Sequence, residues 1–248
     1  MATPRPLDDI LKHPAVWRYG EAPTLPKEAT NFGFDPLDQV LPAGGWEEGG
    51  LTEILANEQG IGELSLLLPA ASRVSKAGRG IVLVAPPFVP FPHAWEAKEV
   101  VLKQVVIIRA QGKEALWAME QAARSGACGM VIGWTASCAK DTNYQALRRL
   151  QMAADTGKTL LALYRPQTVA GDASAAPTRL RVWAAAGDLQ IHAFKRRAAM
   201  PAPPIRVSVY PKHWTRPRRS RGGQVARPVL VDAAIPLTPP SQQLNASR

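Results

Sequence analysis

Runs of consecutive apolar residues alternate with amphipathic segments through the middle of the chain. Continuous β-branched runs flanked by helical patterns are typical of central strands in a parallel sheet. The amphipathic segments repeat their apolar residues at helical spacing. Strand and helix patterns alternate four times, which predicts an α/β fold with a doubly wound, mostly parallel sheet and helices on both faces. The predicted strands are 51–55, 81–85, 104–109, 128–134 and 159–164, and the predicted helices are 36–41, 64–77, 92–102, 112–125 and 143–156.

The remaining patterns predict how the chain begins and ends. Antiparallel strands at 180–184 and 189–195, followed by a short alternating strand at 205–210, are expected at the C-terminal edge of the sheet. Residues 1–28 carry five prolines and are expected to form an arm. Residues 211–248 are basic, contain prolines and have few aromatics, so we expect them to be disordered in isolation. The predicted organisation is an arm (1–28), a core (29–210) and a tail (211–248).

Local signals predict where some helices begin and end. Asp35 is expected to cap the first predicted helix, and Pro36 suits its first position. Pro69 lies inside the second helical pattern and is expected to kink or interrupt it. Gly126 follows the fourth pattern in the position of a C-terminal cap.

The 248-residue chain has the apolar content of an ordinary globular protein and a strongly basic balance. Apolar residues make up 46% of it, the formal net charge is +10 and the isoelectric point is about 10.0. The basic residues crowd toward the C-terminal end, which favours a polyanionic partner, nucleic acid above all; a soluble basic surface is the alternative. Cys128 and Cys138 have no CxxC pattern, so we expect reduced thiols and no metal site. The N-terminus has no apolar core of signal-peptide length and no run reaches about 18 apolar residues, so the cytoplasm is the expected compartment.

One stretch has the layout of a phosphate-binding loop without its chemistry. A predicted strand leads into a turn with Gly60 and Gly62, and a helix is expected to open at Glu63 and Leu64. A P-loop reads G-x-x-x-x-G-K-[ST]: backbone N–H groups and the lysine hold the phosphates, and the hydroxyl binds magnesium. Here Glu63 takes the place of the lysine, and Leu64 takes the place of the hydroxyl. At about 4 Å and an effective dielectric of about 20, a like charge facing a phosphate costs about 4 kcal/mol, so no nucleotide cofactor is expected.

Several segments together carry a resemblance to a known family. Residues 30–50, the strand–turn–helix at 51–68 and A-R-S-G-A-C-G-M-V-I-G-W-T-A-S at 123–137 resemble the core of the RecA recombinases. A closer resemblance, on G-I-G-E-L-S-L-L-L-P-A, A-L-W-A-M-E-Q-A-A-R-S-G-A-C-G and F-K-R-R, is to the ImuA family. These are translesion DNA synthesis-associated proteins of bacterial SOS mutagenesis cassettes, related to the cell-division inhibitor SulA. The resemblance covers roughly residues 13–210 and implies a RecA-like sheet.

The resemblance also implies that the catalytic groups of the recombinase site have been lost. The P-loop lysine and hydroxyl fall on Glu63 and Leu64, and the glutamate that activates water falls near Pro86. The magnesium-linked aspartate falls on Trp134 or one residue earlier, and the glutamine that senses the γ-phosphate falls on Arg165 or one residue later. Phosphoryl transfer depends on positioning and on charge stabilisation by lysine and metal. Four coincident losses imply no ATPase activity; a register shift of one or two residues is the alternative at any single position.

Two basic segments are candidate binding sites. Lys195 and Arg197, with Arg196 between them, stand where recombinases carry the basic pair that reaches the nucleotide of a neighbouring subunit. We expect them to form a partner or filament interface that docks at a RecA filament end and touches its ATP; a solvated patch or a DNA contact is the alternative. The tail interleaves one aromatic with many cations, which suits single-stranded DNA or an acidic protein partner. Its candidate contact residues are Lys212, Trp214, Arg216, Arg218, Arg219 and Arg221.

The function that the resemblance implies is that of a non-catalytic RecA-like accessory protein in SOS-induced, error-prone translesion DNA synthesis. The expected partners are RecA, an ImuB-type polymerase-like protein and, through it, the bypass polymerase and the sliding clamp, with DNA as a further partner and no membrane. Two other functions stay open: a RecA-like ATPase with a rearranged site, and a division inhibitor of the SulA kind. Hydrolysis of nucleotide by the chain would support the ATPase. Inhibition of division-protein polymerisation would support the division inhibitor.

The other polar and aromatic residues are expected to be structural. The four histidines are scattered without metal-ligand spacing. Four tryptophans are expected to pack in the interior rather than to form a stacking platform, and three glutamates are expected on a solvated face. These are Trp46, Trp95, Trp117 and Trp183, and Glu47, Glu48 and Glu53.

Overall fold

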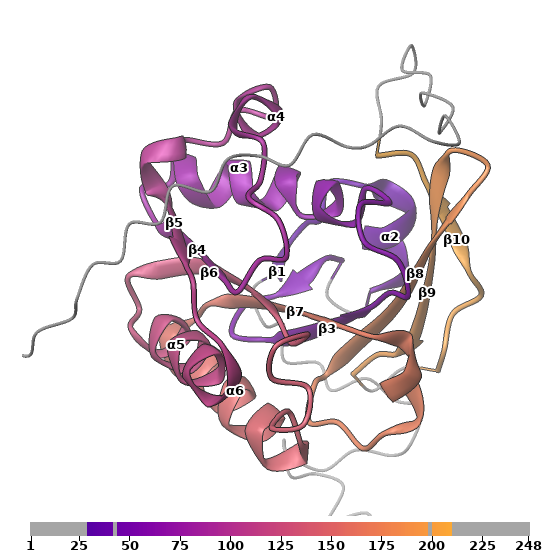
Figure 1. Cartoon of the computed structure of the whole chain (residues 1–248). Coiled ribbons are helices and arrows are strands. Elements are labelled where there is room, and N and C mark those ends of the chain that lie inside the picture. Colours follow the sequence, from indigo (N-terminus) through magenta and orange to yellow (C-terminus); the bar gives the residue numbers. More distant parts are fainter. Residues whose placement is uncertain (1–28, 42–43, 198–199, 210–248) are drawn as a thin grey trace, which may run out of the picture. The chain divides into compact units, whose positions relative to one another are not determined.

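The computed structural model describes residues 29–41, 44–197 and 200–209 (Figure 1). These residues form a mixed α/β structure around one large, mostly parallel sheet. The predicted arm at 1–28 and the predicted tail at 211–248 lie outside the described residues. The described strands of the large sheet are β3 (Leu51–Leu55), β4 (Gly80–Val84), β5 (Val105–Ile108), β6 (Cys128–Trp134), β7 (Leu160–Arg165), β8 (Thr178–Ala185), β9 (Asp188–Lys195) and β10 (Ile205–Val207).

The strands of the sheet lie in the order β10-β9-β8-β3-β7-β6-β4-β5. Neighbours from β8 to β5 pair in parallel, whereas β8 with β9 and β9 with β10 pair antiparallel. The antiparallel strands therefore lie at the C-terminal edge of the sheet, as the sequence predicts. A separate two-stranded ribbon joins β1 (Ala29–Thr30) to β2 (Trp46–Glu47).

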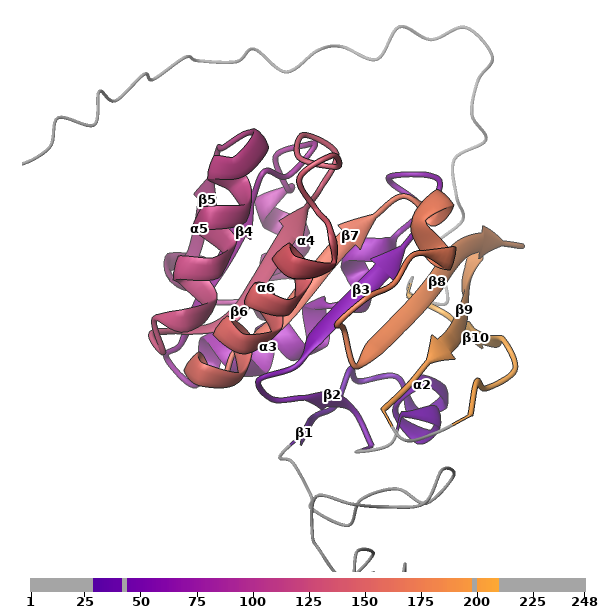
Figure 2. The same ribbon diagram turned by 90° about the horizontal axis from the view of Figure 1, so that it is seen from below.

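Helices cover both faces of the sheet (Figures 1 and 2). One face carries α2 (Asp35–Val40), α3 (Leu68–Lys76) and α4 (Pro92–Glu96), and the other carries α5 (Gly112–Arg124) and α6 (Tyr144–Gly157). Successive residues of the central strands enter opposite cores, because side chains alternate across a strand. In β7, for example, Leu160 and Ala162 lie in one core while Leu161 and Leu163 lie in the other. Burial on both faces explains why these strands read as continuous apolar runs.

The short 3₁₀ helices account for two differences from the predicted helices. The pattern at 64–77 is divided into η1 (Glu63–Leu66) and α3, with Pro69 in the first turn of α3, which confirms the predicted interruption. The pattern at 92–102 is also divided, because α4 ends at Glu96 and η2 (Leu102–Gln104) follows. A third 3₁₀ helix, η3 (Gln167–Gly171), follows β7.

The prediction that Asp35 caps α2 is wrong. Phe34 occupies the cap position, and no side chain there accepts a hydrogen bond from the helix. The carboxylate of Asp38 instead accepts the backbone N–H groups of Phe32, Gly33 and Phe34, at 2.6, 3.0 and 3.2 Å. Asp38 is buried while Asp35 is exposed, so the acid one turn inside the helix organises the preceding loop.

The four tryptophans divide into two pairs. Trp46 and Trp95 are buried, as expected, and Trp46 stacks on Phe32 with ring centroids 5.1 Å apart. The expectation is wrong for Trp117 and Trp183, which are 64% and 37% exposed. Trp117 lies on the outer side of α5, and Trp183 lies on the part of β8 that pairs with β9.

Candidate functional site

A cavity of 440 Å³ opens beyond the carboxyl ends of β3, β6 and β7. Doubly wound sheets bind ligands at this end of their strands, and the volume lies in the range of small-molecule sites. Three of the residues predicted from the sequence line it: Glu63, Trp134 and Arg165. The other lining residues are Ala56, Asn57, Glu58, Gln59, Thr135, Ala136, Ala139, Tyr164 and Pro166.

The turn between β3 and η1 is closed by its own carboxylate. Gly60 and Gly62 both have positive φ, at +73° and +97°, which favours glycine at these positions. The carboxylate of Glu63 turns back and accepts the N–H of Gly60 at 3.2 Å and the N–H of Ile61 at 2.9 Å. In a phosphate-binding loop, such backbone donors hold the anion. Here a side chain of the chain itself takes two of them.

An aromatic pair forms one wall of the cavity. The rings of Trp134 and Tyr164, at the ends of β6 and β7, stack with centroids 5.2 Å apart and an angle of 14° between their planes. The Tyr164 hydroxyl donates to the backbone carbonyl of Glu63 at 2.9 Å. Burial raises the pKa of Tyr164 well above its usual value, with a smaller contribution from the nearby Glu63 charge. The phenol is therefore a neutral hydrogen-bond donor that ties β7 to the turn.

Arg165 belongs to a buried cluster of charged side chains and is not solvated. Each oxygen of the Glu53 carboxylate lies 2.5 Å from a guanidinium nitrogen, one of Arg165 and one of Arg179. Glu53 is 0% exposed, so the expectation of a solvated face is wrong for this residue. The geometry has a simple origin, since β3 lies between β7 and β8 and Glu53 is the direct register partner of Arg179.

Backbone carbonyls complete the coordination of both guanidinium groups. Arg165 donates to the carbonyl of Thr142 at 3.1 Å. Arg179 donates to three carbonyls of the segment that covers it, those of Val169, Ala170 and Asp172, at 2.9 to 3.1 Å. The cluster therefore joins three strands, η3 and the loop that contains Thr142 next to the cavity, and it leaves Arg165 little freedom to follow a ligand.

The other predicted residues of the degenerate nucleotide site do not meet at the cavity. Leu64 is partly buried and packs against the core. Pro86 follows β4, which is separated from β3 by β7 and β6, and it does not line the cavity. Of the positions that the resemblance equates with recombinase groups, the structure thus brings Glu63, Trp134 and Arg165 to the cavity but not Pro86.

The three basic residues at 195–197 contact three different parts of the chain. Lys195 donates from Nζ to the carbonyl of Ser174 at 2.7 Å, and Arg196 donates to the carbonyls of Val40 and Met200. Arg197 lies 3.3 Å from Glu47, and its side chain is 42% exposed. Burial lowers the pKa of Lys195, the Arg179 charge lowers it further and the Glu53 charge opposes this. Arg197 is therefore the best exposed of the three.

Tyr164, Thr135 and Arg179 are site residues that the sequence interpretation missed. Tyr164 lies at the end of one apolar strand run, and Thr135 directly follows another. Side chains at the carboxyl ends of parallel strands meet in a crevice, so both residues could have been predicted from their place at the strand ends. Arg179 carried no such signal, because it lies 126 positions from its partner Glu53. The predicted tail contacts from Lys212 to Arg221 lie outside the described residues.

Among the described residues, no group of three or more histidines, cysteines or acids is placed to hold a metal ion, and both cysteines are free. No helix in this part of the chain is long and apolar enough to cross a membrane. Comparison with known proteins gives no family model that matches the chain and no curated protein that resembles it.

Proposed function

We propose that this chain is a non-catalytic, RecA-like adaptor of SOS-induced translesion DNA synthesis, as its resemblance to the ImuA family implies. The sheet supports the RecA-like part of the proposal, because its parallel core continues into antiparallel strands at the C-terminal edge. In this function the chain connects RecA and DNA with an ImuB-type polymerase-like protein, and through it with the bypass polymerase and the sliding clamp.

The observation that carries the non-catalytic part is the carboxylate of Glu63 on the turn amides. It occupies the N–H groups of Gly60 and Ile61 and brings negative charge to the place where a phosphate would lie. Trp134 and Tyr164 fill the neighbouring strand ends with a hydrophobic stack where a metal-linked acid would be needed. Phosphoryl transfer needs cationic stabilisation of the phosphates, and these groups supply none.

The purified chain is expected to hydrolyse no ATP above the buffer rate, with or without single-stranded DNA. The measurement is phosphate release, together with binding of a fluorescent ATP analogue. Trp134→Ala serves as the matched variant, because it removes one wall of the cavity, and thermal unfolding checks that it is folded. Hydrolysis by the wild type that this variant abolishes would overturn the non-catalytic proposal and favour an ATPase with a rearranged site.

Arg197→Ala is expected to weaken binding of a RecA filament at least about fivefold, because exposed arginines often dominate protein interfaces. Surface plasmon resonance with immobilised RecA filaments, formed with an ATP analogue, measures the effect. Arg109→Ala is the control, since Arg109 is also exposed but follows β5 at the opposite edge of the sheet. Equal affinities for the wild type and Arg197→Ala would contradict this assignment.

A further inference from the structure

The sheet extends beyond its covering helices on one side. Figure 2 shows that α5 and α6 cover the strands from β7 to β5, while β8, β9 and β10 continue past them. In β9, Leu189, Ile191 and Ala193 point into the core that contains α2 and α3. The alternate residues Gln190, His192 and Phe194 are only partly buried, so they lie on the opposite face, in the part that α5 and α6 do not cover.

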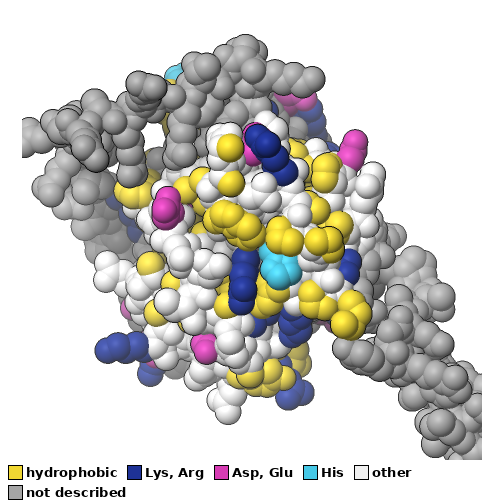
Figure 3. Space-filling view, turned by 90° about the vertical axis from the view of Figure 1, so that its right-hand side faces the viewer, with side chains coloured by type: hydrophobic (Ala, Val, Ile, Leu, Met, Phe, Trp, Pro, Cys, Tyr) yellow, Lys and Arg dark blue, Asp and Glu magenta, His cyan; other side chains and the backbone are white. Residues whose placement is uncertain are grey.

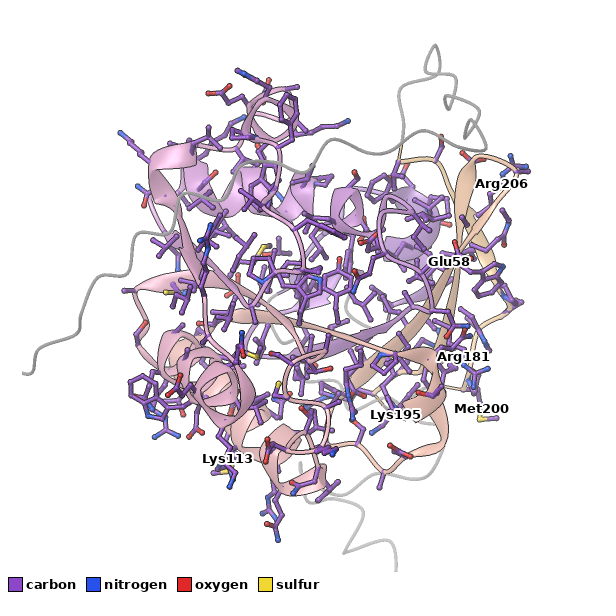
Figure 4. All side chains as sticks on the ribbon, in the orientation of Figure 1. Glu58, Lys113, Arg181, Lys195, Met200 and Arg206 are labelled. Atoms are coloured by element: carbon purple, nitrogen blue, oxygen red, sulfur yellow. The ribbon has the colours of Figure 1, made fainter. Side chains whose placement is uncertain are left out.

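Aromatic and basic side chains share this uncovered face. Register places Arg181 opposite His192, Trp183 opposite Gln190, and Arg206 of β10 opposite Gln190 on its other side. We call the set Arg181, Trp183, His192, Phe194 and Arg206 the aromatic–basic face. Figure 3 shows a histidine surrounded by hydrophobic and basic side chains on this side of the molecule, and Figure 4 shows Arg181 and Arg206 there, with Lys195 nearby.

The positive charge of the face is not balanced within it. The Arg181 guanidinium lies 4.8 Å from the centre of the Phe194 ring, and among the described residues it makes no hydrogen bond or ion pair. Arg179 lies 5.0 Å from the same ring and shares the single charge of the Glu53 carboxylate with Arg165. Arg206 pairs with Asp188. The guanidinium of Arg181, stacked on an aromatic ring and without an anionic partner among the described residues, is suited to a phosphate or to the face of a base.

We propose that the aromatic–basic face binds single-stranded nucleic acid. Partly exposed rings on an open sheet offer stacking surfaces to unpaired bases, and the cations beside them neutralise phosphates. A duplex keeps its bases stacked on one another and cannot use the rings, so single strands bind better than duplex. The inference rests on the proposed function for its choice of DNA, and it assigns the contact to the sheet in addition to the basic tail.

The test is fluorescence anisotropy of a labelled oligothymidine with the full chain. Trp183→Ala and Arg181→Ala are each expected to weaken binding about tenfold, and Trp183→Phe to restore most of the loss. Arg181→Ala is also expected to lower the slope of log K against log salt by about 1, because one phosphate contact is lost.

Two variants on other surfaces match the test variants. Trp117→Ala removes an exposed tryptophan from α5, and Arg109→Ala removes an exposed arginine from the far sheet edge. Both are expected to bind like the wild type, and thermal unfolding checks that all variants are folded. Binding that is unchanged in Trp183→Ala and Arg181→Ala would overturn the sheet site and leave the proposed DNA contact to the tail. Absence of any binding by the wild type would instead contradict the DNA part of the proposed function, with the RecA measurement unaffected.

Discussion

Replacing Glu53 with glutamine is expected to lower the free energy of unfolding by about 3–5 kcal/mol, because two buried guanidinium groups lose the one carboxylate that pairs with them among the described residues. Glutamine has the shape of glutamate, but its one carbonyl oxygen serves a single arginine and its amide adds donors that face the other. Arg165 and Arg179 keep their backbone acceptors, so the fold is expected to survive with reduced stability. This decrease is a large part of the whole free energy of unfolding of a typical domain, which is about 5–15 kcal/mol.

Urea unfolding followed by circular dichroism measures the Glu53→Gln effect. Glu114→Gln is the control, because Glu114 is exposed in the first turn of α5 and its loss is expected to change stability by less than about 0.5 kcal/mol. If the free energy of unfolding falls by the same small amount in both variants, the buried cluster contributes no more to stability than a surface charge does. The cluster would then be an arrangement that the protein tolerates and not one on which its fold depends.

The central strands were predictable because each is buried on both faces. The predicted bounds of β3 and β6 coincide with those observed, since an uninterrupted apolar run has only one way to satisfy its burial in a parallel sheet. The C-terminal strands were also found, through their alternation. Helix ends were less predictable, because they depend on contacts from distant residues. The exchange of Asp35 for Asp38 as the organising acid is one such case.

The candidate site was predictable in outline but not in its charge pairing. Glu63, Trp134 and Arg165 were placed at one site by their resemblance to recombinase positions, and the cavity brings these three together. Nothing in the sequence shows that Glu63 folds back onto its own turn, since this depends on the conformation of Gly60 and Gly62. Glu53 resembled a solvated acid for a similar reason: its partners come from two other strands.

The aromatic–basic face was missed because tryptophans in apolar strands are usually buried. Trp183 lies in an apolar stretch, and the sequence cannot show that no helix covers this part of the sheet. The helix that follows β7 is the short η3, and no long helix is described between β7 and β8. In the described part of the chain, η3, loops and a hairpin connect the last strands, so no long helix lies over this face.

Gly157→Ala is expected to lower the free energy of unfolding by about 3 kcal/mol, because an added Cβ would lie 2.0 Å from the backbone carbonyl oxygen of Ala123. That oxygen is fixed, since it belongs to α5 and accepts the hydroxyl of Thr159 at 2.9 Å. The clash is therefore relieved only by moving α6 away from α5. Gly133→Ala provides a graded comparison: its Cβ would meet the flexible side chain of Met119 at 2.5 Å, so a smaller loss is expected.

Gly171→Ala completes the Gly157 series, because its Cβ would meet no atom within 4 Å and its stability is expected to stay within about 0.5 kcal/mol of the wild type. Urea unfolding ranks the three variants. If Gly157→Ala loses no more free energy of unfolding than Gly133→Ala does, α5 and α6 can move apart at a lower cost than their close approach indicates.

Below its unfolding transition, Gly157→Ala is expected to bind oligothymidine like the wild type, because the helices that it displaces do not cover β8 and β9. Stability and nucleic-acid binding are thus expected to vary independently across the two sets of variants.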